Sequence, residues 1–246
     1  TSLTIGLINA YLDNKLDDYL NKLDGDFCAV LYDIESRSVK LISDRYGMRM
    51  LYWYFKDGLF IWGSEVKAIL AVPDIDIEIN QSSFDCFMDL GYLLGEHTWF
   101  ESIKLIRPAS IIDLDLDTLK VSQHYYWKWS EIAPAQLSFD DAVDELGKLF
   151  INAVDKRFNP SDKVGIALSG GLDSRAIFAA VQYLYPDYGG YAYTFGVANC
   201  EDITIAEEVV TRSKWKHKIF NFSDDNWLFS RFEQVWVTDG MLDLKN

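Results

Sequence analysis

The sequence of 246 residues carries 38 Asp and Glu against 23 Lys and Arg, which gives a formal net charge of −15. This balance argues against a nucleic-acid backbone as the main partner, because phosphate contacts need clustered basic side chains. No apolar run reaches membrane-spanning length and no signal pattern opens the chain, so we expect no membrane partner, and three widely spaced cysteines (Cys28, Cys86 and Cys200) fit the reduced thiols of a cytoplasmic protein.

The first part of the chain is typical of an antiparallel α+β domain. Residues 3–23 place apolar side chains at helical spacing, which predicts one amphipathic helix or a pair of helices. Short segments rich in aromatic and β-branched residues follow, and Asp57-Gly58 within FKDGLF is a hairpin-turn signal. Residues 64–71 predict a short helix capped by Ser64, and residues 110–121 predict a further hairpin.

The pattern changes at about residue 130. Ser138 followed by Asp141 predicts the start of a helix that continues to about Phe158. Strands are then predicted over 164–168, 191–197 and 217–222, and they alternate with helices over 174–185, 201–213 and 225–239. This alternation is typical of a parallel α/β domain. We therefore divide the chain into residues 1–130 and residues 131–246.

The stretch VGIALSGGLDSRAIFAAV, residues 164–181, predicts a strand, a short polar loop and a helix. Loops at the carboxyl edge of a parallel sheet are ligand sites, and the following helix directs unpaired N–H groups at them. Two glycines leave room for an anion and two serines add hydroxyl donors (Ser169, Gly170, Gly171 and Ser174). Asp173 would repel a bare phosphate unless a divalent cation lies between them. A capped turn without a ligand is the alternative interpretation, and no Lys-Ser/Thr ending of a kinase-type loop is present.

SGGLDS after an apolar strand is the PP-loop signature of ATP pyrophosphatases, and the chain resembles the asparagine synthetase family of glutamine-dependent amide ligases. Five further blocks carry the resemblance in the family's order: LDGDFCAVLYD, SDRYGMRMLYW, GSEVKAIL, FESIKLIRPAS and YTFGV. The resemblance implies an α+β part followed by an α/β part. Residues 1–130 would form part of an αββα glutaminase domain of the N-terminal-nucleophile type. Residues 131–246 would form the first part of a doubly wound parallel-sheet PP-loop synthetase domain.

The resemblance also implies a reaction: ATP adenylates the aspartate side-chain carboxylate, and ammonia from glutamine then attacks the acyl-adenylate. Transferred position by position, Ser169, Gly170, Gly171 and Ser174 would hold the pyrophosphate, Asp173 would ligate Mg²⁺, and Ala167, Leu168 and Phe195 would border the adenine. Asp239 is a candidate contact to the substrate amino acid, with a turn acid after a helix as the equal alternative. The partners implied are small molecules, and a homodimer is left open.

Several of the family's residues have no counterpart in this sequence. The family's glutaminase begins with Cys, whereas Thr1 is followed by none of the opening strands, so we take Thr1 as an accidental start and Cys28 as a packed residue. The SGEGxDE loop and a later Lys would follow Asn246. No residue of this chain is therefore assigned a certain catalytic role, and the chain alone is expected not to be competent. The three histidines (His97, His124 and His217) match no catalytic position of the family.

Two other functions compete with this interpretation. A ligase resembling β-lactam synthetases or peptide cyclases would use an internal amine in place of ammonia. A homologue that binds ATP without catalysis, or serves as a scaffold, would tolerate the missing segments. Arg175, where a small residue is commoner in the family, and SDR in place of Arg-Asp-Arg both indicate a divergent member.

Overall fold

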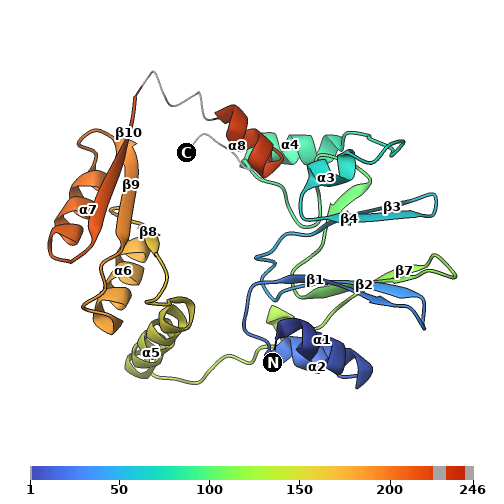
Figure 1. Ribbon diagram of the computed structural model, residues 1–246, viewed down its shortest axis with the longest axis horizontal. Helices are drawn as coiled ribbons and strands as arrows, with labels where there is room; N and C mark the ends of the chain where they lie inside the picture. The colour runs from blue at the N-terminus through green and yellow to red at the C-terminus, as the bar shows by residue number, and fades with distance from the viewer. Residues whose placement is uncertain (1, 224–230, 242–246) are drawn as a thin grey trace. The chain divides into compact units, whose positions relative to one another are not determined.

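The computed structural model describes residues 2–223 and 231–241 and forms two compact units (Figure 1). Unit 1 comprises the chain up to Ala133 together with the segment that begins at Phe232, and unit 2 comprises Pro134–Arg231. The C-terminal helix α8, Arg231–Thr238, thus lies almost entirely in unit 1, although the sequence placed it in the second domain. The remainder of the helix predicted over 225–239 falls largely outside the described residues.

Unit 1 contains two antiparallel sheets. The larger has the strand order β1-β2-β6-β7, with β1 at Cys28–Asp33, β2 at Ser38–Ser43, β6 at Ser110–Asp115 and β7 at Val121–Tyr125. The smaller has the order β4-β3-β5, with β3 at Tyr52–Lys56, β4 at Leu59–Gly63 and β5 at Ile103–Leu105. The helices are α1 (Leu3–Leu12), α2 (Leu16–Lys22), α3 (Val66–Leu70) and α4 (Gln81–Leu90), with a 3₁₀ turn at Trp129–Glu131.

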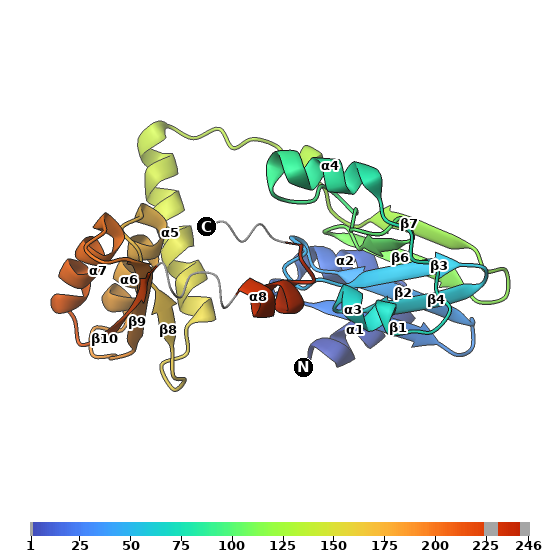
Figure 2. The same ribbon diagram turned by 90° about the horizontal axis from the view of Figure 1, so that it is seen from above.

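Three layers of apolar side chains pack between these helices and sheets. Alternate residues of a strand point to opposite faces of its sheet, so Ile42 of β2 packs toward α1 and α2 while Leu41 packs toward the smaller sheet. On the far face of the smaller sheet, Tyr54 packs with Ile69 of α3. Unit 1 is therefore a helix–sheet–sheet–helix stack, with α1 and α2 on one outer face and α3 on the other (Figures 1 and 2).

The local signals of unit 1 are largely confirmed. Residues 3–23 form a pair of helices rather than one. Asp57 and Gly58 both adopt positive φ, 51° and 77°, as a tight hairpin between β3 and β4 requires. Ser64, however, is not the cap of α3: Glu65 occupies the N-cap position, and neither side chain caps the helix. Helix α4 and the three-residue strand β5 were not predicted.

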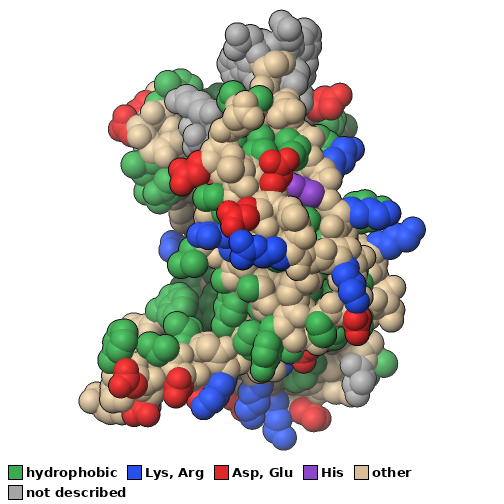
Figure 3. Space-filling view, turned by 90° about the vertical axis from the view of Figure 1, so that its left-hand side faces the viewer, with side chains coloured by type: hydrophobic (Ala, Val, Ile, Leu, Met, Phe, Trp, Pro, Cys, Tyr) green, Lys and Arg blue, Asp and Glu red, His purple; other side chains and the backbone are tan. Residues whose placement is uncertain are grey.

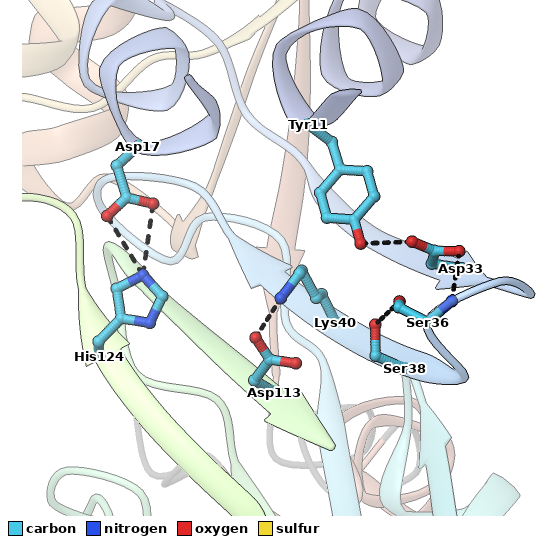
Figure 4. A network of polar contacts seen from close by, with 8 residues as sticks. All are labelled: Tyr11, Asp17, Asp33, Ser36, Ser38, Lys40, Asp113 and His124. Atoms are coloured by element: carbon cyan, nitrogen blue, oxygen red, sulfur yellow. Dashed lines mark hydrogen bonds and ion pairs between the residues drawn. The ribbon is translucent and has the colours of Figure 1, made fainter. Parts of the chain in front are cut away.

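Polar contacts join the α1–α2 pair to the larger sheet (Figure 4). The Tyr11 hydroxyl donates to the Asp33 carboxylate, with 2.6 Å between the oxygens, and His124 Nε2 lies 3.2 Å from an Asp17 oxygen. The Tyr11 hydroxyl and the backbone N–H of Ser36 lower the pKa of Asp33 to about 2. These bonds bind the helices to β1 and β7 at the rim of the core.

Unit 2 is a parallel sheet with helices. Its strands run in the order β10-β9-β8, with β8 at Gly165–Ala167, β9 at Tyr191–Val197 and β10 at Lys216–Phe222, and its helices are α5 (Phe139–Arg157), α6 (Leu172–Leu184) and α7 (Glu201–Thr211). The Ser138 hydroxyl accepts from the Asp141 N–H at 3.2 Å, so the predicted cap is confirmed. A Cβ atom at Gly190 would lie 2.7 Å from the ring of the buried Trp215, which explains glycine before β9.

Helices α6 and α7 pack on the same face of the sheet. Ala192 and Thr194 of β9 are buried beneath them, whereas Tyr193, Phe195 and Val197 on the opposite face are exposed. The sheet is parallel as predicted, but the described residues cover only one of its faces with helices. The doubly wound arrangement therefore remains a prediction.

Candidate functional site

The loop between β8 and α6 lies at the carboxyl end of the parallel strands, as the sequence predicted. Leu168 continues β8 by donating its N–H to the Tyr193 carbonyl at 2.9 Å, and the helix begins at Leu172 with Gly171 as its N-cap. Because Gly171 carries no side chain, the first turn of α6 has no side-chain cap at this position. The positive end of the helix therefore faces the loop with backbone N–H groups free of an N-cap side chain.

Two serines close the loop on itself. The Ser169 and Ser174 hydroxyl oxygens lie 3.1 Å apart, and the Ser174 hydroxyl also accepts the Ser169 N–H at 3.1 Å. The Ser169 hydroxyl accepts the Gly171 N–H at 3.2 Å. The structure thus brings together three of the four residues predicted to hold pyrophosphate, with both hydroxyls at the mouth of the helix.

Gly170 differs from this expectation. Its N–H donates to the Asp202 carboxylate, with 2.7 Å between nitrogen and Oδ1. Asp202 lies in the first turn of α7, and sequence reasoning did not identify it. The only local signal was its place at the start of a helix after β9, where such acids are common.

Thr194 and His217 form hydrogen bonds that stabilise the end of the strand before the loop. The buried Thr194 hydroxyl donates to the Leu168 carbonyl at 2.7 Å and lies 2.8 Å from Nε2 of His217. Because the single hydroxyl hydrogen is used on the carbonyl, Thr194 can only accept from His217, which assigns the proton to Nε2. His217 therefore has a structural partner.

The three residues predicted to border adenine lie in two environments. Ala167 is exposed, and Phe195 on β9 is 55% exposed. Leu168 is 2% exposed and its side chain belongs to the core of unit 2. Only the backbone of Leu168 is therefore available to a ligand.

Asp239 is engaged within unit 1. Its Oδ2 accepts the Val66 N–H at 2.6 Å and its Oδ1 lies 3.0 Å from Nζ of Lys67, so it caps α3 from a distant part of the chain. Burial lowers the pKa of Lys67, but hydrogen bonds to Glu65 and Asp239 outweigh burial and raise it. These contacts describe a structural acid that follows a helix, and contact with a substrate remains a prediction.

Two residues of the blocks that resemble the family, Asp44 and Cys28, lie in surroundings that indicate a structural role. The Asp44 carboxylate is buried and accepts four backbone N–H groups, from Phe27, Tyr46, Met48 and Arg49. Burial, followed by the charge of Asp44, raises the pKa of the Cys28 thiol. A raised pKa disfavours the thiolate nucleophile, in agreement with Cys28 as a packed residue. Thr1 lies outside the described residues.

Residues 212–218 carry several basic side chains, and two of them are paired with acids. Arg212 lies 2.7 Å from Glu208 and Lys214 lies 2.5 Å from Asp187, both on exposed side chains. Figure 3 shows acidic and basic side chains next to each other on the face it presents, with hydrophobic side chains between them. None of the helices in the described part of the chain is long and apolar enough to cross a membrane.

Comparison with known proteins assigns both parts of the chain to known families. Residues 2–127 match the family model of the glutamine amidotransferase domain, and residues 145–243 match the model of asparagine synthase. Asparagine synthetase [glutamine-hydrolyzing] 3 of Bacillus subtilis is 33% identical over 180 residues, which cover 73% of this chain and 29% of the relative. Putative asparagine synthetase [glutamine-hydrolyzing] 2 of Methanocaldococcus jannaschii is 25% identical over 234 residues, which cover 93% of this chain and 45% of the relative.

The chain spans less than half the length of these curated relatives. A protein named amidase chry2, of Gibberella zeae, is 25% identical over 169 residues, 68% of this chain and 24% of that protein. With an amidotransferase domain followed by a synthase domain in the order the motifs predicted, the chain belongs to the asparagine synthetase family of glutamine-hydrolysing ligases.

Proposed function

We propose that the protein to which this chain belongs is an ATP-dependent ligase that activates the side-chain carboxylate of aspartate and amidates it with ammonia from glutamine. The observation that carries the proposal is the loop between β8 and α6, which combines two hydroxyls with an uncapped helix N-terminus. The match of residues 2–127 to a glutamine amidotransferase domain supports glutamine, rather than an internal amine, as the nitrogen source. The activity is proposed for the whole protein.

The residues of the loop fit a pyrophosphate group. Ser169 and Ser174 offer hydroxyl donors, and Gly171 leaves the start of α6 open to an anion. Their role would be to orient the phosphates and to stabilise the negative charge that develops on the leaving group when the carboxylate attacks. Gly170 would contribute by shaping the loop, because its N–H is bonded to Asp202. Ala167, the Leu168 backbone and Phe195 would border the adenine.

Asp173 fits a role as a ligand of Mg²⁺. It lies in the first turn of α6, directly before Ser174 in the sequence. Within residues 2–223 and 231–241, no group of three or more metal-ligating side chains gathers around one point. Mg²⁺ is commonly held by one or two carboxylates together with substrate phosphates and water, so Asp173 suits it without a larger cluster of acids. When bound, the ion would neutralise phosphate charge, and Asp173 would hold it at the loop.

The fold supports the same assignment. The helix–sheet–sheet–helix stack of unit 1 agrees with a glutaminase domain of the N-terminal-nucleophile type over residues 1–130. The parallel sheet of unit 2 agrees with the first part of a doubly wound synthetase domain over residues 131–246.

Calorimetric titration of the chain with ATP in the presence and absence of Mg²⁺ tests the nucleotide site. We expect Mg²⁺-dependent binding to the parent chain and its loss in Asp173→Ala. Asp187→Ala is the matched control, because Asp187 is an exposed acid of unit 2 paired with Lys214, and it should bind like the parent. If a folded parent chain does not bind ATP, the ligase proposal is overturned, and normal binding by Asp173→Ala would leave Asp173 as a helix-terminal acid only.

The substrate is tested on the full-length protein. Pyrophosphate release measured over a panel of amino acids should be highest with aspartate. Release of glutamate from glutamine distinguishes a glutamine-dependent ligase from one that uses an internal amine.

A further inference from the structure

We propose that Asp202 is a positioning residue of the nucleotide loop, which holds the loop to helix α7 in its binding conformation. The inference rests on the proposed ATP site and deepens it. Asp202 is 32 positions from the loop in sequence, yet its Oδ1 accepts the Gly170 N–H at 2.7 Å. A hydrogen bond to a carboxylate is shorter and stronger than one between neutral groups.

The close approach of α7 leaves little room for a side chain at position 170. A Cβ atom at Gly170 would lie 2.9 Å from Asp202 Oδ1, 3.1 Å from Ile205 Cδ1 and 3.3 Å from Asp202 Cα. Real Cβ atoms essentially never approach a neighbour within 3.0 Å, so any larger residue would displace the carboxylate. Gly170 and Asp202 therefore act as a pair, and the glycine serves the contact with α7 rather than contact with an anion.

Helix α7, which carries Asp202, is held in place by its buried residues. Ile203 and Ala206 of α7 are buried against the sheet, at 5% and 0% exposure. The backbone N–H groups of Ser169 and Gly171 instead donate to the hydroxyls of Ser174 and Ser169, and a hydroxyl rotates readily toward a new partner. Asp202 thus fixes the loop from outside while the two hydroxyls remain available to reorient toward phosphate.

Hydrogen exchange of the Gly170 amide, followed by NMR on the nucleotide-free chain, tests the anchor directly. Asp202→Ala should accelerate exchange about tenfold or more, as expected for loss of a bond to a charged group. Asp202→Asn retains an acceptor and should give a smaller increase. Glu201→Ala removes a charge from the same turn of α7 and serves as the control, with exchange at Gly170 unchanged. Equal exchange in Asp202→Ala and the parent chain would overturn the proposal.

Calorimetric titration with ATP and Mg²⁺ tests the consequence for binding. Asp202→Ala should weaken affinity about tenfold while thermal unfolding confirms a folded chain, and Asp202→Asn should restore most of the affinity. Tighter binding by both variants would overturn the proposal, because Asp202 would then be an anion that occupies a phosphate position. Gly170→Ala keeps the acid but displaces it, and it provides the same comparison if Asp202→Ala does not fold.

The two proposals fail in different ways. A parent chain that does not bind ATP refutes the nucleotide site, and the exchange of the Gly170 amide still decides whether Asp202 holds the loop. A parent chain that binds ATP, with unchanged affinity in Asp202→Ala, refutes the positioning role alone.

Discussion

Replacing Thr194 with valine should destabilise unit 2 at the strand that leads into the loop between β8 and α6. Valine has nearly the shape of threonine, so packing is retained while the hydroxyl is lost. That hydroxyl donates to the Leu168 carbonyl at 2.7 Å and lies 2.8 Å from His217 Nε2, and Thr194 is 2% exposed. Removing it leaves one buried acceptor and one ring N–H without this partner.

The magnitude follows from these two hydrogen bonds. Leaving a buried polar group unsatisfied costs about 1–3 kcal/mol, so we expect Thr194→Val to lower the free energy of unfolding by about 2 kcal/mol. Thr194→Ser keeps the hydroxyl and loses one methyl group, which is worth about 0.8 kcal/mol. Thr211→Val is the control, since Thr211 is exposed and its hydroxyl donates to the Glu207 carbonyl of the same helix, and its effect should stay within about 0.5 kcal/mol.

Hydrogen exchange resolved by peptide is the appropriate assay, because it reports on unit 2 separately from unit 1. A loss of 2 kcal/mol accelerates exchange of the β8 and β9 amides by a factor of about 30. Nitrogen chemical shifts of His217 should in addition show the proton on Nε2 in the parent chain. The reasoning is refuted if Thr194→Val destabilises β8 and β9 no more than Thr194→Ser.

Three further outcomes follow from described contacts. Gly190→Ala places a methyl group 2.7 Å from the ring of the buried Trp215, so it should lower the free energy of unfolding, measured by denaturant titration, by about 1–3 kcal/mol. The control is Gly147→Ala, at an exposed position of α5 with nothing within 4 Å, which should raise that free energy by about 0.5–1 kcal/mol. A similar effect of the two substitutions would contradict the clash. Asp239→Ala removes the distant cap of α3 and should destabilise unit 1 by about 1–3 kcal/mol, with Asp239→Asn less affected because asparagine also tolerates its positive φ of 52°. Asp33 has a pKa of about 2 in the folded chain, and carboxyl NMR titration should show this pKa rising toward its ordinary value in Tyr11→Phe. Because the pKa of Asp33 is lower in the folded than in the unfolded chain, the stability that the ionised carboxylate contributes is present above about pH 4 and is lost as the pH falls toward 2.

The local elements were within reach of the sequence because their signals are local. A two-residue turn such as Asp57-Gly58 depends on backbone preferences at those positions, and the cap at Ser138 involves a residue three positions away. The order strand, loop, helix at residues 164–181 likewise follows from hydrophobic periodicity. The four serine and glycine positions of the loop and the acid beside them could therefore be named as a candidate anion site.

Contacts between distant segments decided the rest. Glu65, rather than Ser64, became the N-cap of α3 because the Asp239 carboxylate, 173 positions away, takes the Val66 N–H. The strand β5 has only three residues, and its pairing with β3 sustains it, which no local pattern signals.

The sequence by itself thus determined the family and the two kinds of fold, and it named the loop residues of the candidate site, because these depend on residue types at short spacing. Only the tertiary structure decided what holds the loop in place. A hydrogen bond between the Gly170 N–H and the Asp202 carboxylate depends on where α7 packs on the sheet. That packing is a property of the whole core, so no local pattern around Gly170 could predict this hydrogen bond.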